Sequence, residues 1–143
     1  MWIRKKFVLG IILGLCLLTT VSCMNLTNNQ KKYYEDTNNY ISITGVIEYL
    51  KFDDSNRILY LQFSEMDEKL DDNCFKIVDE NYSVIVRNGA KDSFEIGQQV
   101  TFTTAPKYFG NGYVMPIVKL SIDNEVLLDF ETGYENLLNW LYE

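Results

Sequence analysis

The reactive side chains of this 143-residue chain are few, and histidine is missing altogether. Without histidine, a serine or cysteine nucleophile lacks its usual general base, and a histidine-based zinc site cannot form. The glycine-rich phosphate-binding patterns are absent, and no serine is followed three residues later by lysine. We therefore expect a protein that is not an enzyme, with no catalytic residue, no metal centre and no cofactor.

Acidic side chains crowd the segment from Glu65 to Asp72 and invite a comparison with calcium-binding loops. The spacing does not fit an EF-hand, because Lys69 occupies a ligand position and no glycine lies at the turn. We interpret these carboxylates as a solvated surface. Loose calcium binding, or a hydrolase built on two carboxylates that meet across a cleft, stay open as minor alternatives.

The first 22 residues have the layout of a secretion signal. Arg4, Lys5 and Lys6 form a basic head, and an uncharged apolar run follows over Phe7 to Leu18. A run of this length suits a signal peptide. A membrane-spanning helix usually needs about 20 apolar residues, so an uncleaved anchor is the weaker alternative.

Cys23 follows a small residue, in the sequence Thr20-Val21-Ser22-Cys23. This tetrapeptide resembles the lipobox of bacterial lipoproteins, although Thr20 stands where leucine is usual. The resemblance implies that residues 1–22 are removed and that Cys23 carries a diacylglyceryl group. Two acyl chains make a durable anchor, so the protein is expected on a membrane, facing outside the cytoplasm. An ordinary signal peptide with an incidental Cys23 is the alternative.

Cleavage before Cys23 leaves 121 residues, which is enough for one domain. All 20 acidic but only 10 basic side chains remain, giving a net charge of −10. This charge disfavours nucleic acid as a partner, because such binding depends on basic side chains that neutralise phosphates. Cys74 would be left without a disulfide partner, and we expect it to be a buried apolar side chain.

Two regions follow Cys23 in the sequence. Residues 23–39 are polar and predict a flexible tether, whereas residues 40–143 predict a single β-rich domain. The first strand of that domain contains Gly45, which indicates a bend, and Ile41, Ile43, Ile47 and Tyr49 are expected on one face. Further strands are predicted at 59–63, 75–78, 82–87, 100–103, 118–122 and 126–130, with 75–87 as one bent strand the alternative.

The C-terminal part predicts a hairpin and a helix. Asp123-Asn124 has the composition of a two-residue hairpin turn. Thr132 and Glu135 have the spacing of a capping box at the start of a helix. An apolar stripe then follows at helical spacing and predicts packing against the sheet; it consists of Tyr134, Leu137, Leu138 and Leu141.

The order of these elements, with a bent strand containing Gly45 and the segment Phe94–Val100 leading into a later strand, resembles an OB-fold over about residues 41–122. The resemblance implies a mainly β protein: a small OB-like barrel of five to seven short strands, with an added C-terminal hairpin and amphipathic helix. A β-sandwich is the alternative architecture.

An aromatic and glycine-containing segment, 108–116, is the candidate binding surface, through Tyr108, Phe109 and Tyr113. The alternative is that these rings cover the open end of the barrel. The sequence thus predicts a monomeric, membrane-anchored binding module of the cell envelope, with a possible envelope protein as partner. An accessory structural subunit of an envelope complex is the second hypothesis.

Overall fold

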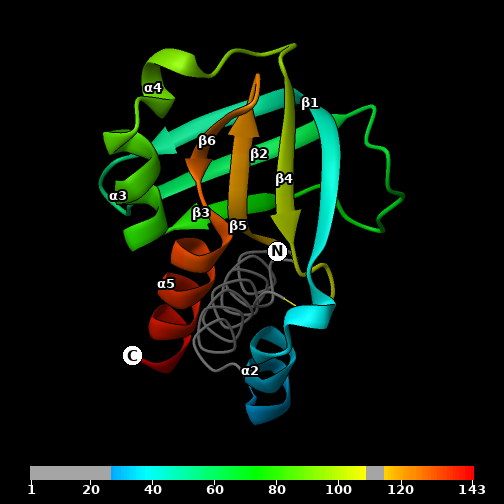
Figure 1. Ribbon diagram of the computed structural model, residues 1–143, viewed down its shortest axis with the longest axis vertical. Coiled ribbons are helices and arrows are strands. Elements are labelled where there is room, and N and C mark those ends of the chain that lie inside the picture. The colour runs from blue at the N-terminus through cyan, green and yellow to red at the C-terminus, as the bar shows by residue number, and fades with distance from the viewer. Residues whose placement is uncertain (1–26, 109–114) are drawn as a thin grey trace, which may run out of the picture.

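Figure 1 shows the computed structural model of the chain, which describes residues 27–108 and 115–143. Short strands form one mixed sheet: β1 (Ile41–Asp53), β2 (Ile58–Ser64), β3 (Phe75–Val78), β4 (Gln99–Thr104), β5 (Met115–Ile122) and β6 (Glu125–Leu128). Helical segments accompany them: α2 (Asn28–Glu35), η1 (Thr37–Asn39), α3 (Glu80–Arg87), α4 (Ala90–Ser93) and α5 (Phe130–Tyr142).

The strands close into a ring. Antiparallel pairing gives the order β3-β2-β1-β4-β5-β6, and β3 also pairs in parallel with β5 at Phe75–Met115 and Lys76–Pro116. The ring therefore runs β1-β2-β3-β5-β4, with β6 attached outside it as the second strand of a hairpin. A five-stranded, partly open ring is the OB-like arrangement, and the mainly β prediction with its added hairpin and helix is confirmed.

Strand β1 serves both halves of the ring. Its first part, Ile41 to Val46, pairs with β4, and the part from Val46 to Asp53 pairs with β2. At Gly45 a Cβ atom would lie 3.1 Å from the Cβ of Phe63, closer than Cβ atoms usually approach, so glycine eases the crossing of the two strands. The predicted bend is present, and the extra residue of the accompanying bulge is Glu48.

Three phenylalanine rings fill the barrel. Phe63 and Phe102 stack with ring centroids 4.3 Å apart, and Phe75 meets both rings edge-on at 5.3 and 4.9 Å. All three side chains are buried. Aromatic packing of this kind contributes about 0.5–1.5 kcal/mol per pair beyond the burial of area.

Residues 82–87, predicted as a strand, belong to helix α3, so this prediction is wrong. The β-branched run Val84-Ile85-Val86 favours a strand locally. The helix instead buries Asn81, Tyr82 and Ile85, which lie on one side of a helical turn. Tertiary burial thus overrides local preference, and the alternative of one bent strand over 75–87 fails for the same reason.

The expected flexible coil over 23–39 is folded in the part that the structure describes. Thr27 and Gln30 form a capping box that starts α2, with the Gln30 side chain accepting from the Thr27 N–H at 2.8 Å. Tyr34 is fully buried in a second apolar cluster with Val118, Leu137 and other residues. Residues 27–39 thus belong to the folded unit, whereas the sequence predicts that it begins at Tyr40.

Helix α5 is present, but it begins earlier than the predicted capping box at Thr132 and Glu135. Its N-cap is Asp129, whose carboxylate accepts from the Thr132 N–H at 2.9 Å and from the Thr132 hydroxyl at 2.8 Å. The predicted stripe faces the barrel, with Leu137 and Leu141 buried and Tyr134 and Leu138 half-buried. Within the described ranges, no helix is both long enough and apolar enough to cross a membrane.

Gly133 sets how closely α5 approaches β5. A Cβ atom at Gly133 would overlap the backbone carbonyl of Val118, which cannot give way as a side chain could. We predict that Gly133→Ala lowers the free energy of unfolding by about 1–3 kcal/mol, the usual cost of overpacking a core. Denaturant titration measures this change. The exposed Asn139→Ala in the same helix is the control, and equal effects of the two changes would contradict the close contact.

The N-cap of α5 makes the stability of the fold depend on pH. The hydrogen bonds from the Thr132 backbone and hydroxyl lower the pKa of Asp129. A lowered folded-state pKa stabilises the fold above the unfolded value of about 4, and this stabilisation is lost as the pH falls through the folded value. We predict that Asp129→Ala costs about 1 kcal/mol at pH 7, whereas Asp129→Asn keeps most of the cap.

Melts between pH 2 and pH 7 check this prediction. The difference between wild type and Asp129→Ala should shrink as the pH falls through the acid range. A constant difference over the whole range would show that the Asp129 charge plays no part in the cap.

Candidate functional site

The outer face of β1, β2 and β3 brings tyrosine, lysine, glutamine and cysteine side chains next to one another. Alternation along β2 buries Leu59, Leu61 and Phe63 in the barrel and turns Tyr60 and Gln62 outward. Strand register then places residues of the neighbouring strands beside these two side chains. The result is two rows that cross three strands: Lys51–Tyr60–Lys76, and Tyr49–Gln62–Cys74.

These rows border an open pocket of about 220 Å³, which we call the β1–β3 groove. Its lining consists of Tyr49, Lys51, Tyr60, Leu61, Gln62, Cys74 and Phe75. Pockets that enclose a drug-sized ligand have about 300–1,000 Å³. The groove is smaller, and its size suits one ring of a longer molecule that lies across the sheet.

Tyr49 reaches the groove because of the bulge in β1. The prediction that Tyr49 shares a face with Ile47 is wrong. The extra residue Glu48 shifts the alternation, so Ile47 is buried while Tyr49 is 43% exposed. A bulge commonly re-aims a side chain in this way.

Tyr60 lies between two lysines, one on each neighbouring strand. Lys51 and Lys76 are its partners in the β1 and β3 registers, and the Lys76 Nζ lies 5.9 Å from the Tyr60 ring centroid. A cation near an aromatic face is attracted by the ring quadrupole. Lys51 lines the groove, whereas Lys76 lies next to Tyr60 outside the lining.

Cys74 was expected to be a buried apolar side chain, and the structure corrects this expectation. Cys74 immediately precedes β3, where it is half-buried with a free thiol. The Gln62 Nε2 donates a weak hydrogen bond to the Cys74 sulfur at 3.7 Å. The thiol therefore belongs to the wall of the groove and not to the core.

Of the predicted binding surface, only Tyr108 lies within the described residues, and Phe109 and Tyr113 lie outside them. Tyr108 is 37% exposed, and its ring meets the edge of Tyr33 from α2 at 5.4 Å between centroids. The Lys107 N–H donates to the Tyr33 hydroxyl at 3.1 Å. Tyr108 is thus partly packed and partly exposed, between the two outcomes that the sequence left open.

The acidic segment 65–72 is held in place partly by its own side chains. The Asp67 carboxylate accepts from the Thr44 N–H at 2.8 Å, and the Asp67 N–H donates to the Thr44 carbonyl at 3.0 Å. These bonds fasten the segment to β1. In the described ranges, no three acidic or cysteine side chains lie close enough together to hold a metal ion.

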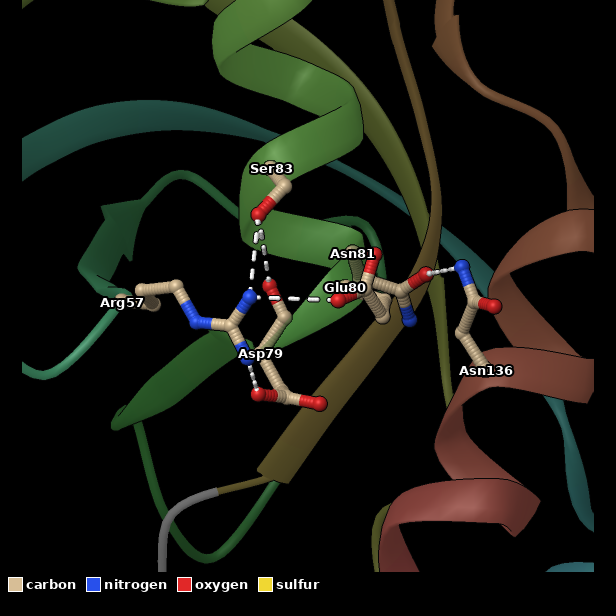
Figure 2. Close-up of polar contacts among 6 residues, drawn as sticks. All are labelled: Arg57, Asp79, Glu80, Asn81, Ser83 and Asn136. Atoms are coloured by element: carbon tan, nitrogen blue, oxygen red, sulfur yellow. Dashed lines mark hydrogen bonds and ion pairs between the residues drawn. The ribbon is translucent and has the colours of Figure 1, made fainter.

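A second polar cluster joins the β1–β2 turn to α3 (Figure 2). The Arg57 guanidinium pairs with Asp79 and with Glu80, the latter at 3.1 Å, and reaches the Ser83 hydroxyl. The hydrogen bond to Glu80 is the main cause that raises the pKa of Arg57. Because opposite charges meet here, the cluster connects elements and does not present a free acid or base.

Asn81, drawn in the same view, links α3 to α5 (Figure 2). It is buried, donates to the Gly133 carbonyl at 2.8 Å and accepts from the Asn136 amide at 3.0 Å. These bonds satisfy a polar group that would otherwise be costly to bury. The cluster as a whole is therefore structural.

Asp54 also has a perturbed pKa. Asp54 accepts from Lys91 at 2.6 Å and from the Tyr82 hydroxyl, and these bonds lower the pKa of Asp54. Burial is the first cause that raises the pKa of Tyr82 to about 12. Asp54 thus stays ionised, unlike the raised-pKa carboxyl that a general acid needs.

Comparison of the chain with protein-family models, with curated proteins and with solved structures gives no match. The geometry of the groove and the residues of the sequence are accordingly the basis for assigning a function.

Proposed function

We propose that this chain is a non-enzymatic binding module of the bacterial cell envelope, anchored by lipid on Cys23, with the β1–β3 groove as its binding face. The observation that carries the proposal is the position of Tyr60 between Lys51 and Lys76, beside the row that begins at Tyr49. The pocket combines two tyrosine rings with the Lys51 cation and the Gln62 amide, and Lys76 lies beside Tyr60 at its border.

The side chains of the groove suit a saccharide with anionic substituents. Tyrosine rings offer a flat apolar surface with a hydroxyl handle, which matches a sugar ring and its rim of hydroxyls. Lys51 and Lys76 would meet a carboxylate or phosphate on the sugar. OB-folds use the face of strands 2 and 3 for oligosaccharides and oligonucleotides, and the proposed position outside the cytoplasm favours the first.

The anchor rests on the resemblance of residues 20–23 to a lipobox. Anchoring on the outer side of the membrane would hold the groove among the glycans of the envelope, where a saccharide module is useful.

An accessory structural subunit of an envelope complex is the second candidate. The partly exposed Tyr108, beside Tyr33, favours it, because aromatic side chains are enriched in protein interfaces. Such a subunit would bind its partner through Tyr108 and not through the groove.

Lipid attachment is checked by intact mass of the protein from bacterial membranes. We expect the wild-type chain to begin at Cys23 and to carry the mass of a diacylglyceryl group. Cys23→Ser should leave the precursor unprocessed or release the protein without lipid. A wild-type residue 23 without lipid would contradict the anchor.

Saccharide binding is checked by titrating the protein with soluble fragments of anionic envelope glycans. We expect Tyr60→Ala to weaken binding by at least about tenfold, the loss that follows from removing about 1.4 kcal/mol of contact. Tyr108→Ala is the control and should bind as the wild type does. The reverse order of effects would favour the interface at Tyr108 and the accessory-subunit hypothesis.

A further inference from the structure

Helix α2 lies very close in the sequence to the residue proposed to carry the lipid. Thr27 already caps α2, through its hydrogen bonds with Gln30. Only three residues separate Cys23 from Thr27. Even a fully extended chain spans at most about 3.6 Å per residue, so the start of α2 lies within roughly 15 Å of the lipidated residue. A tether of this length cannot hold the domain clear of the lipid headgroups.

Helices α2 and α5 lie at the same end of the long axis (Figure 1), and side chains of the two helices are in contact. The Lys31 Nζ lies 5.0 Å from the Tyr142 ring centroid, and the Tyr142 hydroxyl bonds to the Glu35 carboxylate. The Tyr134 hydroxyl also donates to the Glu35 carbonyl at 2.6 Å. We call this end the α2–α5 pole and define it by Lys31, Lys32, Trp140 and Tyr142.

The α2–α5 pole has the side chains of a membrane interface. Trp140 is 36% exposed and Tyr142 is 54% exposed, and both are among the few large apolar side chains on the described surface. Tryptophan and tyrosine are enriched where a membrane meets water. Lys31 and Lys32 add cations with apolar stems, which can extend along lipid while the charge stays among the headgroups.

We propose that the α2–α5 pole contacts the headgroup region of the phospholipid bilayer, so that the lipoprotein has one fixed orientation on the membrane. This proposal rests on the proposed lipid anchor, which brings the pole to the surface. The aromatic side chains then keep it there. The connection between α4 and β4 lies at the opposite end of the long axis and faces away from the membrane (Figure 1).

Trp140 is a natural reporter, because cleavage before Cys23 removes Trp2 and leaves Trp140 as the only tryptophan. The processed lipoprotein is reconstituted in vesicles of phosphatidylglycerol and phosphatidylcholine that carry a spin label on some headgroups. We expect the label to quench about half of the Trp140 fluorescence, and aqueous iodide to quench it weakly, as for a side chain at the interface. This measurement needs no substitution.

A matched control moves the tryptophan to the other end. Trp140→Phe combined with Ile96→Trp places it in the connection between α4 and β4, where Ile96 is 68% exposed. We expect iodide to quench this reporter strongly and the headgroup label to leave it unchanged. An unaltered thermal melt shows that the doubly substituted protein is folded.

Three outcomes separate the proposals. Quenching of Trp140 but not of the control by the headgroup label supports the orientation. Equal quenching of both reporters, or iodide access to Trp140 in protein whose mass shows the lipid, overturns the docked pole and leaves the anchor standing. A mass without lipid on Cys23 overturns both the anchor and the docked pole.

Discussion

The crossing of β1 over the end of β2 at Gly45 is the contact on which the rest of the barrel depends. Because Gly45 has no side chain, Phe63 lies only 3.1 Å from the position that a Cβ atom would take. β1 can then leave β4 and continue along β2, which is how one strand serves both halves of the ring. The stacking of Phe63 on Phe102 joins those halves from inside.

The same strand also connects the barrel to the candidate site. The bulge at Glu48 accompanies the change of partner, and it turns Tyr49 outward beside Gln62. The bulge that accompanies the bend in β1 therefore also determines which side chains line the groove. Without the bulge, the alternation along β1 would turn Tyr49 into the core, and the groove would lose one of its walls.

Local patterns in the sequence predict the parts of this fold that depend on local chemistry. The turn at Asp123 and Asn124 is where the sequence places it, and both residues have positive φ, as a two-residue hairpin turn of the primed type requires. The period-two strands and the bend near Gly45 are likewise predictable. The start of α2 is also signalled, since Thr27 and Gln30 have capping-box spacing, but the polar composition around them favours a coil.

Other features depend on contacts between distant residues and leave no local signal. The β-branched run in α3 indicates a strand until burial of Asn81 and Ile85 is known. The two rows of the groove can be found only when the registers of three strands are known. Counting alternate residues along β1 gives the wrong face for Tyr49, because the bulge adds a residue. Tyr60 and Lys76 are 16 positions apart, and no periodicity of a strand or helix relates them. The local clustering of aromatic residues and glycines instead led to the prediction of Tyr108, Phe109 and Tyr113 as the binding surface.

The parallel contact between β3 and β5 has a consequence for the order of folding. It joins Phe75 to Met115 and Lys76 to Pro116 by only two residue pairs, and the residues are 40 positions apart. Two residue pairs offset little of the chain entropy lost in closing the ring, whereas the antiparallel β1–β4 pairing extends over six residue pairs. The barrel is therefore expected to close last at this seam and to open there first, while the hairpins on either side stay paired.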